Sequence, residues 1–228
     1  MGTQELLLAA GVGRGDEVVV PSYAITAAAA DAVRATGATP VFADIDPVTY
    51  CLAPVSVAAV LTSRTRAVVV AELFGHPVHL DAHPLPVIHH AEPGDAGPPE
   101  DRDAVRRRRE NAAQLDAGLT GVLTPVVSPG VEHRFDAYVV RVPGNGRPDR
   151  DAFARALRLR GVDCRVPVRT PVHRMPAYRR DVRLPHTERA ADECLALPVD
   201  AGLSRSELHR IISACNALGG LLPHGTAA

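Results

Sequence analysis

Short β-branched runs alternate with helical segments over residues 1–90, and this alternation constrains the fold more than any other feature of the chain. The runs lie in GDEVVVP, TPVFADID, RAVVVAELFG and LPVIHH, and segments with helical apolar spacing separate them. Strands that alternate with helices pair in parallel, and strands this apolar are buried on both faces. The sequence therefore predicts an α/β fold with a mostly parallel sheet.

Polar residues stand where these predicted strands end. They are Pro21-Ser22-Tyr23, Asp44-Ile45-Asp46, Glu72 and His89-His90. Ligands of such sheets bind outside the carboxyl ends of the strands, so these positions are candidates for a site. If both histidines belong to the last strand, they point to opposite faces, and only one of them reaches a cleft.

Composition narrows the classes of function. The chain has 228 residues, 46% of them hydrophobic and 22% charged, which is typical of a globular protein. Its net charge of -1 does not indicate the excess of basic residues that is typical of proteins that bind nucleic acid or anionic membranes. No apolar run is long enough to cross a bilayer, and the N-terminal stretch lacks the basic region of a signal peptide. The four cysteines have no CxxC spacing, so we expect a reduced, cytoplasmic protein.

The chain contains no lysine. All 25 of its basic side chains other than histidine are arginines. No side-chain amine therefore exists to form a Schiff base with a carbonyl compound.

The second half of the chain has a different pattern. It predicts a helix with a solvated face at Arg106–Arg109, then strands over 133–144 and 162–168 and helices over 147–161, 186–197 and 204–220. Ser204 and Glu207 fit a capping box at the start of the last helix. We expect two domains, a large one over 1–130 and a smaller α+β domain over 131–228.

The ordered motifs resemble the DegT/DnrJ/EryC1/StrS aminotransferases. The stretch GVGRGDEVVVPSYAITAAAADAVRATGATPVFADIDPVTY is similar to the N-terminal signature of that family, and RAVVVAELFGHPVHLDA continues the match. LPVIHHAEP lies where the family has V-I-E-D-A-A-Q at the end of a strand. TPVHRMPAYR resembles the family's P-L-H-x-Q-P-x-Y loop, and LALPVDAGLSRSEL resembles the segment that leads into its final helix. The resemblance implies a pyridoxal-phosphate (PLP) enzyme fold: a trimmed aminotransferase-type large domain plus a small C-terminal α+β domain.

Departures from the family's pattern fall on the positions that carry its chemistry. The stacking aromatic residue falls on Ile25, and the aspartate that pairs with the pyridinium nitrogen falls on His90. The segment that carries the Schiff-base lysine is absent, and Pro93–Pro99 bridges the gap. Transamination needs an imine and a carboxylate on the ring nitrogen, so we expect no PLP cofactor.

Site residues follow from the same matching. The resemblance puts His90 and Glu72 in one cleft, where they would form an acid–base pair near neutral pH. Gly2-Thr3 falls on the phosphate-binding turn of the family, so a small-molecule substrate could carry an anionic group there. The residues expected to contact this substrate are Gly2, Thr3, Tyr23, Arg169 and His173. The histidines at 76, 79 and 83 lack metal-ligand spacing, so no metal is expected.

Three hypotheses about function remain open at this point. The first is a repurposed, PLP-independent enzyme of sugar or natural-product biosynthesis that uses the old cleft. The second is a non-catalytic pseudo-aminotransferase that binds a full-length relative and modulates it. The third is a decayed gene product with no role. The family builds its sites at a homodimer interface, so the resemblance implies a homodimer, or a heterodimer with a full-length relative.

Overall fold

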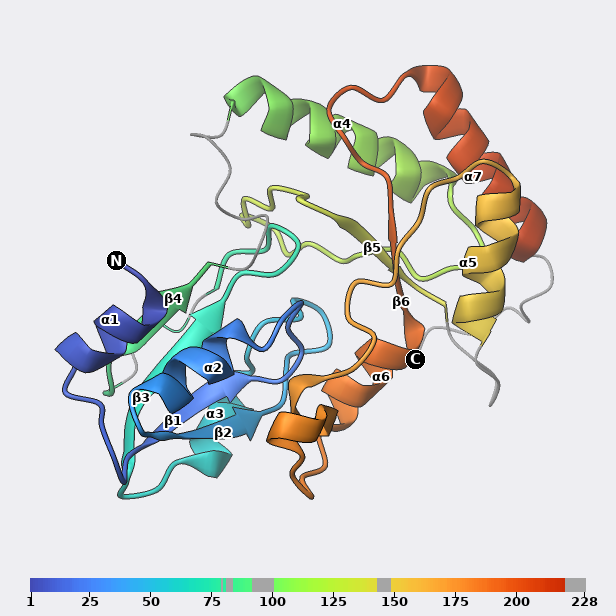
Figure 1. The fold of residues 1–228 in the computed structure, drawn as a ribbon. Helices are drawn as coiled ribbons and strands as arrows, with labels where there is room; N and C mark the ends of the chain where they lie inside the picture. Colours follow the sequence, from blue (N-terminus) through green and yellow to red (C-terminus); the bar gives the residue numbers. More distant parts are fainter. Residues whose placement is uncertain (79, 81–83, 92–100, 143–148, 220–228) are drawn as a thin grey trace. The chain divides into compact units, whose positions relative to one another are not determined.

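The computed structural model describes residues 1–78, 80, 84–91, 101–142 and 149–219, which Figure 1 draws as ribbon. The chain forms two compact units. The first consists of Met1–Gly97 and Thr170–Ala191, and the second of Pro98–Arg169 and Asp192–Ala228. The stretch Pro93–Pro99 and the residues His79 and His83 lie outside the described residues.

A four-stranded sheet organises the first unit. Its strands are β1 (Glu17–Pro21), β2 (Thr39–Ala43), β3 (Thr65–Ala71) and β4 (Val87–His90). Their order is β2-β1-β3-β4, and every pairing is parallel. The predicted parallel α/β sheet is therefore confirmed, and each predicted strand of this half falls on an observed one.

Helices cover both faces of this sheet. The helices α1 (Thr3–Ala9) and α2 (Ala28–Ala35) bury Leu7 and Val33 against the side chains of Val18, Val69 and Ile88. The helix α3 (Pro54–Val60) lies on the other face, where Val57 packs with the alternate residues of β1 and β3. Alternation along the strands thus separates two apolar layers, one on each side of the sheet.

The segment Thr170–Ala191 returns to the first unit. It contains the 3₁₀ turns η1 (Val172–Arg174) and η2 (Pro176–Tyr178) and most of the helix α6 (Pro185–Glu193). Val172, Tyr178 and Leu184 are buried in the same apolar cluster as α1 and α2. The Tyr178 hydroxyl donates to Asp31 on α2.

The second unit packs helices on a two-stranded sheet. Its elements are α4 (Arg102–Gly118), β5 (Tyr138–Arg141), α5 (Asp149–Leu159), β6 (Cys194–Leu197) and α7 (Arg205–Gly219). β5 and β6 pair antiparallel, and Leu115, Leu157 and Leu195 are fully buried in the core of this unit. The helix α4 has the predicted solvated face, where Arg106 pairs with Asp103 and Glu110.

Three expectations about the second half differ from the structure. The predicted helix 186–197 ends at Glu193, because the run Cys194–Leu197 is wholly buried and pairs with β5 as a strand. The predicted strand 162–168 contributes only a single bridge, from Arg165 to Ala196. The compact units also differ from the division 1–130 and 131–228, since α4 contacts α7 and since Thr170–Ala191 packs on the first sheet.

The described residues lack two features that would have indicated a class of function. None of the helices in this part of the chain has the length and apolar character needed to cross a bilayer. The same residues contain no group of three or more His, Cys, Asp or Glu side chains arranged to hold a metal ion.

Candidate functional site

The carboxyl ends of β1 and β2 are in contact with the returning segment Thr170–Ala191. The backbone amide of Val172 donates to the Ser22 carbonyl at 2.9 Å, and the amide of His173 donates to the Ser22 hydroxyl at 3.0 Å. Ser22 is fully buried and His173 is only 2% exposed. Part of the sheet edge where a ligand was expected is therefore filled by the chain itself.

Ser22, His173 and Glu188 form a buried chain of polar contacts. The Ser22 hydroxyl lies 2.6 Å from Nδ1 of His173, and Nε2 of the same ring lies 3.5 Å from Oε1 of Glu188. Burial lowers the pKa of His173, the nearby Arg174 guanidinium lowers it further, and Glu188 opposes both. The ring is therefore neutral at pH 7, and the tautomer decides which of Ser22 Oγ and Nδ1 donates the hydrogen bond. His173 was expected to bind substrate, whereas its ring is occupied in holding this segment.

Asp44 holds the start of α6. Its carboxylate accepts the backbone amides of His186 at 3.0 Å and Thr187 at 2.8 Å, and also the amide of Ile45. Burial alone would raise the pKa of Asp44, but these hydrogen bonds outweigh it and the pKa is lowered. An ionised carboxylate at the first amides of a helix is a stabilising cap.

His90 contacts the first helix. Its Nδ1 lies 2.7 Å from the hydroxyl of Thr3, and Gly2 donates its backbone amide to Glu5 at 3.0 Å. The Nε2 atom is buried and has no hydrogen-bond partner within the described residues. Burial also lowers the pKa of His90, so the ring is neutral at pH 7. Thr3 and His90, both expected in the site, are thus brought together.

Glu72 is not brought together with His90. His90 pairs in register with Ala71 and lies on the face of α1 and α2, while Glu72 follows the last residue of β3. The electrostatics agree, because Glu72 acts on Cys51, which is buried in the cluster beneath α3. Burial raises the pKa of the Cys51 thiol to about 11, and the charge of Glu72 adds to this. Neither ring nitrogen of His90 bonds to Glu72, since Nδ1 contacts Thr3 and Nε2 has no partner among the described residues.

Two further candidates lie in different surroundings. Tyr23 is fully buried in an aromatic cluster, with ring centroids 5.9 Å from Tyr50 and 6.3 Å from Phe74. Arg169 is an exposed residue of the second unit. Sequence reasoning gave no role to Ser22, Asp44 or Glu188, although Ser22 and Asp44 were flagged as strand-end residues.

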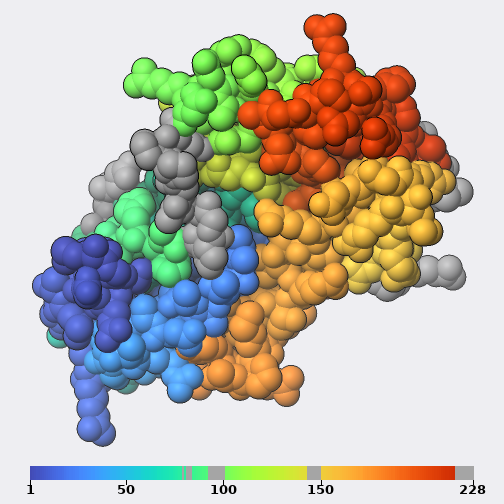
Figure 2. Space-filling model, turned by 45° about the horizontal axis from the view of Figure 1, so that its top comes forward, coloured from blue at the N-terminus to red at the C-terminus, as the bar shows by residue number. Residues whose placement is uncertain are grey.

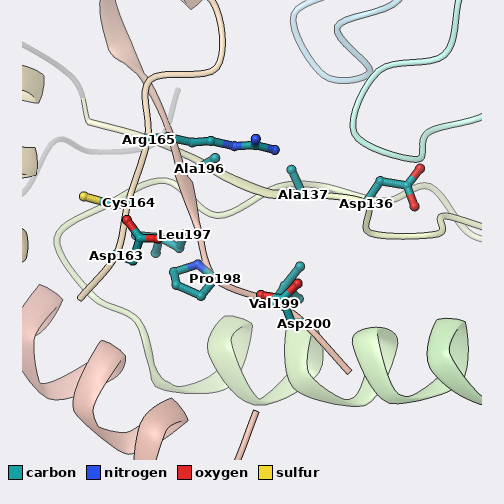
Figure 3. A pocket seen from close by; sticks show the side chains of 10 residues that line it. All are labelled: Asp136, Ala137, Asp163, Cys164, Arg165, Ala196, Leu197, Pro198, Val199 and Asp200. Atoms are coloured by element: carbon teal, nitrogen blue, oxygen red, sulfur yellow. The ribbon is translucent and has the colours of Figure 1, made fainter. Parts of the chain in front are cut away.

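A cavity of about 270 Å³ lies in the second unit, around the end of β6 (Figure 3). Arg165 lines one side of it, and Asp163 and Asp200 lie below Arg165 in the view. Asp136 also lines it but is paired with Arg108 and Arg134. The Cys164 thiol points away to the Ala154 carbonyl at 3.5 Å, and burial raises its pKa. Among the described residues that line the cavity, the one thiol is therefore not activated.

Comparison with known proteins identifies the class. The sequence model of the DegT/DnrJ/EryC1/StrS aminotransferase family matches residues 2–84 and 102–216. An aminotransferase, TlmJ from Streptoalloteichus hindustanus, has the same fold with a TM-score of 0.82 and 26% identity, over 96% of this chain and 83% of that one. The chain belongs to the DegT/DnrJ/EryC1/StrS aminotransferase family.

Two relatives are compared with this chain by the share of each sequence that aligns. An L-glutamine:scyllo-inosose aminotransferase of Streptomyces griseus is 43% identical over 97 residues, which are 38% of this chain and only 23% of that enzyme. A pleiotropic regulatory protein of Geobacillus stearothermophilus is 26% identical over 300 residues, covering 90% of this chain and 79% of the relative. That alignment is longer than the 228-residue chain, so the relative carries residues that have no counterpart here.

Proposed function

We propose that this chain is a non-transaminating member of its family that acts by associating with another aminotransferase chain. The observation that carries the proposal is the absence of lysine from all 228 residues. Lysine supplies the amine that holds PLP as an imine, and no other side chain does this. A chain of this composition has no side chain on which that bond forms.

The surroundings of His90 also fit PLP poorly. The family's aspartate at this position keeps the pyridinium nitrogen protonated by its fixed negative charge. His90 is neutral at pH 7 because burial lowers its pKa, so it supplies no such charge. Its Nδ1 already contacts the hydroxyl of Thr3, a residue of the turn where the family binds the cofactor phosphate. The residues present therefore do not suit the group.

Three observations support association over a new catalytic centre. His90 contacts Thr3 of α1, whereas the charge of Glu72 acts on Cys51 in the cluster beneath α3, and this favours separate surroundings over an acid–base pair. Ser22 and His173, at the end of β1, are buried against each other and are closed to a substrate. One relative that aligns with 90% of the chain is named a regulatory protein.

The partner we propose is a lysine-bearing aminotransferase of sugar or aminocyclitol biosynthesis. This follows from the kind of relative that the N-terminal part resembles, in which the amino group of glutamine is transferred to scyllo-inosose. The role of this chain would be to regulate or stabilise that enzyme. A second copy of this chain is the other partner that the family's homodimers suggest.

A cofactor titration tests the loss of transamination. Purified protein mixed with PLP is expected to show the spectrum of free PLP, with no internal-aldimine band. Borohydride reduction followed by peptide mass spectrometry is expected to find no pyridoxyl group on any internal residue. A reduced adduct within the folded chain would contradict the proposal. A lysine-bearing family member treated in the same way is the positive control.

A further inference from the structure

The sheet of the second unit has two different faces. Leu195 and Leu197 of β6 are buried in one core with the helices α4, α5 and α7, and Figure 2 shows α7 (red) between α4 (green) and α5 (yellow). Ala196 alternates with these two leucines, so its side chain faces away from the helices. Arg165 is the antiparallel partner of Ala196, and residues that pair directly across two strands share a face. The Arg165 side chain is therefore also on the side away from the helices.

A proline ends this pairing at the cavity of Figure 3. The amide of Arg165 donates to the Ala196 carbonyl at 3.1 Å, and the amide of Ala196 donates to the Arg165 carbonyl at 2.8 Å. The next hydrogen-bonded pair of an antiparallel ladder would be Asp163 with Pro198, and proline has no amide hydrogen to donate. Both segments line the cavity of about 270 Å³ at this point. The cavity is thus a consequence of the local sequence of β6.

Charges of both signs line this cavity without pairing with one another. Arg165, Asp163 and Asp200 are exposed, and none of these three side chains has an ion pair or a hydrogen bond with another described residue. Asp136, the fourth charged residue of the lining, is already paired with two arginines. In Figure 3 the Arg165 side chain lies above the cavity residues of β6, and Asp163 and Asp200 lie below it. A guanidinium on one side and two carboxylates on the other therefore remain available to a ligand.

We propose that this cavity binds a small zwitterion with the chemistry of a free aliphatic α-amino acid. The Arg165 guanidinium binds the carboxylate through paired N–H donors, and Asp163 and Asp200 accept the ammonium hydrogens. A ligand with a single charge leaves the opposite charge of the lining without a partner. The uncharged part of the lining suits a hydrocarbon side chain and includes Ala137, Ala196, Leu197, Pro198 and Val199.

Isothermal titration calorimetry with three probes of similar shape tests the charge requirement. L-Leucine carries both charges, isoamylamine has the same skeleton without the carboxylate, and isocaproate has it without the ammonium. L-Leucine is expected to bind the native chain about tenfold more tightly than either analogue, because only L-leucine pairs with both sides of the cavity.

Variants of the charged lining assign each contact. Arg165→Gln is expected to weaken L-leucine binding by about tenfold, the loss typical of one charge-assisted contact, and to leave the weaker binding of isoamylamine unchanged. Asp163→Asn and Asp200→Asn are each expected to weaken the binding of L-leucine and isoamylamine and to leave that of isocaproate unchanged. Circular dichroism is expected to stay native, since all three side chains are exposed.

Arg155→Gln and Asp192→Asn are the matched controls, because both residues are exposed in the second unit and neither lines the cavity. Both controls are expected to bind L-leucine like the native chain. The proposal is overturned if L-leucine does not bind the native chain, or if either analogue binds as tightly as L-leucine. Controls that weaken binding as much as the lining variants would also overturn it.

Discussion

The imidazole of His173 is buried, and because its pKa is lowered by folding, the stability of the chain depends on pH. Its pKa in the folded chain is lowered by burial below the ordinary value of 6.5. The unfolded chain therefore binds a proton at a pH where the folded chain does not. This contribution to stability is complete above pH 6.5 and is lost as pH falls from there toward the lowered folded pKa. His90 contributes in the same direction.

Urea unfolding at pH 7.5 and pH 5.5 measures this dependence. The native chain is expected to lose free energy of unfolding between the two values, and His173→Gln is expected to lose less over the same interval. His209→Gln, at an exposed position, is expected to keep the native slope. An unchanged slope in His173→Gln would mean that this ring titrates alike in the folded and unfolded chain.

The sequence singled out His173, Thr3 and His90 but could not give their partners. His173 and Ser22 are 151 residues apart, and Thr3 and His90 are 87 apart. Contacts across such separations depend on the path of the chain, which periodicity does not encode. The surroundings of Glu72 were missed for a related reason: it follows the last residue of β3, where strand alternation no longer fixes the direction of a side chain.

At the scale of single elements, α6 begins on a carboxylate that comes from another part of the chain. Asp44 accepts the amides of His186 and Thr187, which have no partner inside the helix. Asp44→Ala is expected to lower the free energy of unfolding by about 1–3 kcal/mol, because it removes the cap and leaves buried amides unpaired.

Chemical denaturation measures this loss, and Asp44→Asn is the matched variant. The amide keeps one acceptor oxygen but removes the charge, so a smaller loss is expected. Since the pKa of Asp44 is lowered, its contribution is present above the ordinary value of 3.8 and disappears as pH falls through the folded pKa. Equal stability of Asp44→Ala and the native chain at pH 7 would refute the cap.

The strand β6 shows where local pattern and tertiary structure disagree. Helical spacing continues through CLAL in the sequence, yet these four residues are buried on every side and pair with β5. Four apolar residues in a row suit a strand that is covered on both faces as well as they suit a helix. Cys194–Leu197 form a strand and not a helix because the backbone groups of β5 need hydrogen-bond partners.

Leu195 is the largest side chain of this strand that is fully buried, at 0% exposure. Leu195→Ala is expected to cost about 2–5 kcal/mol, the range for leucine truncation in a packed core. Leu159, at the end of α5, is 88% exposed and serves as the control, since Leu159→Ala is expected to change stability little. Thermal and urea unfolding of both variants compare the two. Similar losses would argue that β6 is not part of the core.

At the scale of the whole molecule, the family match breaks at one place. It stops at residue 84 and resumes at residue 102, so the unmatched stretch contains β4. β4 is the outer strand of the four-stranded order, with β3 as its neighbour among the described strands. The relative from Geobacillus stearothermophilus carries residues that have no counterpart here. We infer that the missing segment adjoined this side of the sheet.

Removing a segment that packs against a sheet uncovers apolar surface, and a second chain is the partner most able to cover it. We therefore expect the purified chain to assemble. Multi-angle light scattering is expected to give about twice the chain mass of 24.1 kDa, or a heterodimer mass when a lysine-bearing family member is co-expressed.

A substitution in β4 tests whether this strand takes part in the assembly. Ile88→Asp, in the buried face of β4, would unfold the sheet, so His89→Glu at the exposed strand position is the better probe. It is expected to weaken assembly while circular dichroism stays native. A soluble monomer at working concentrations, alone and with the co-expressed relative, would rule out both forms of assembly and with them the proposed role.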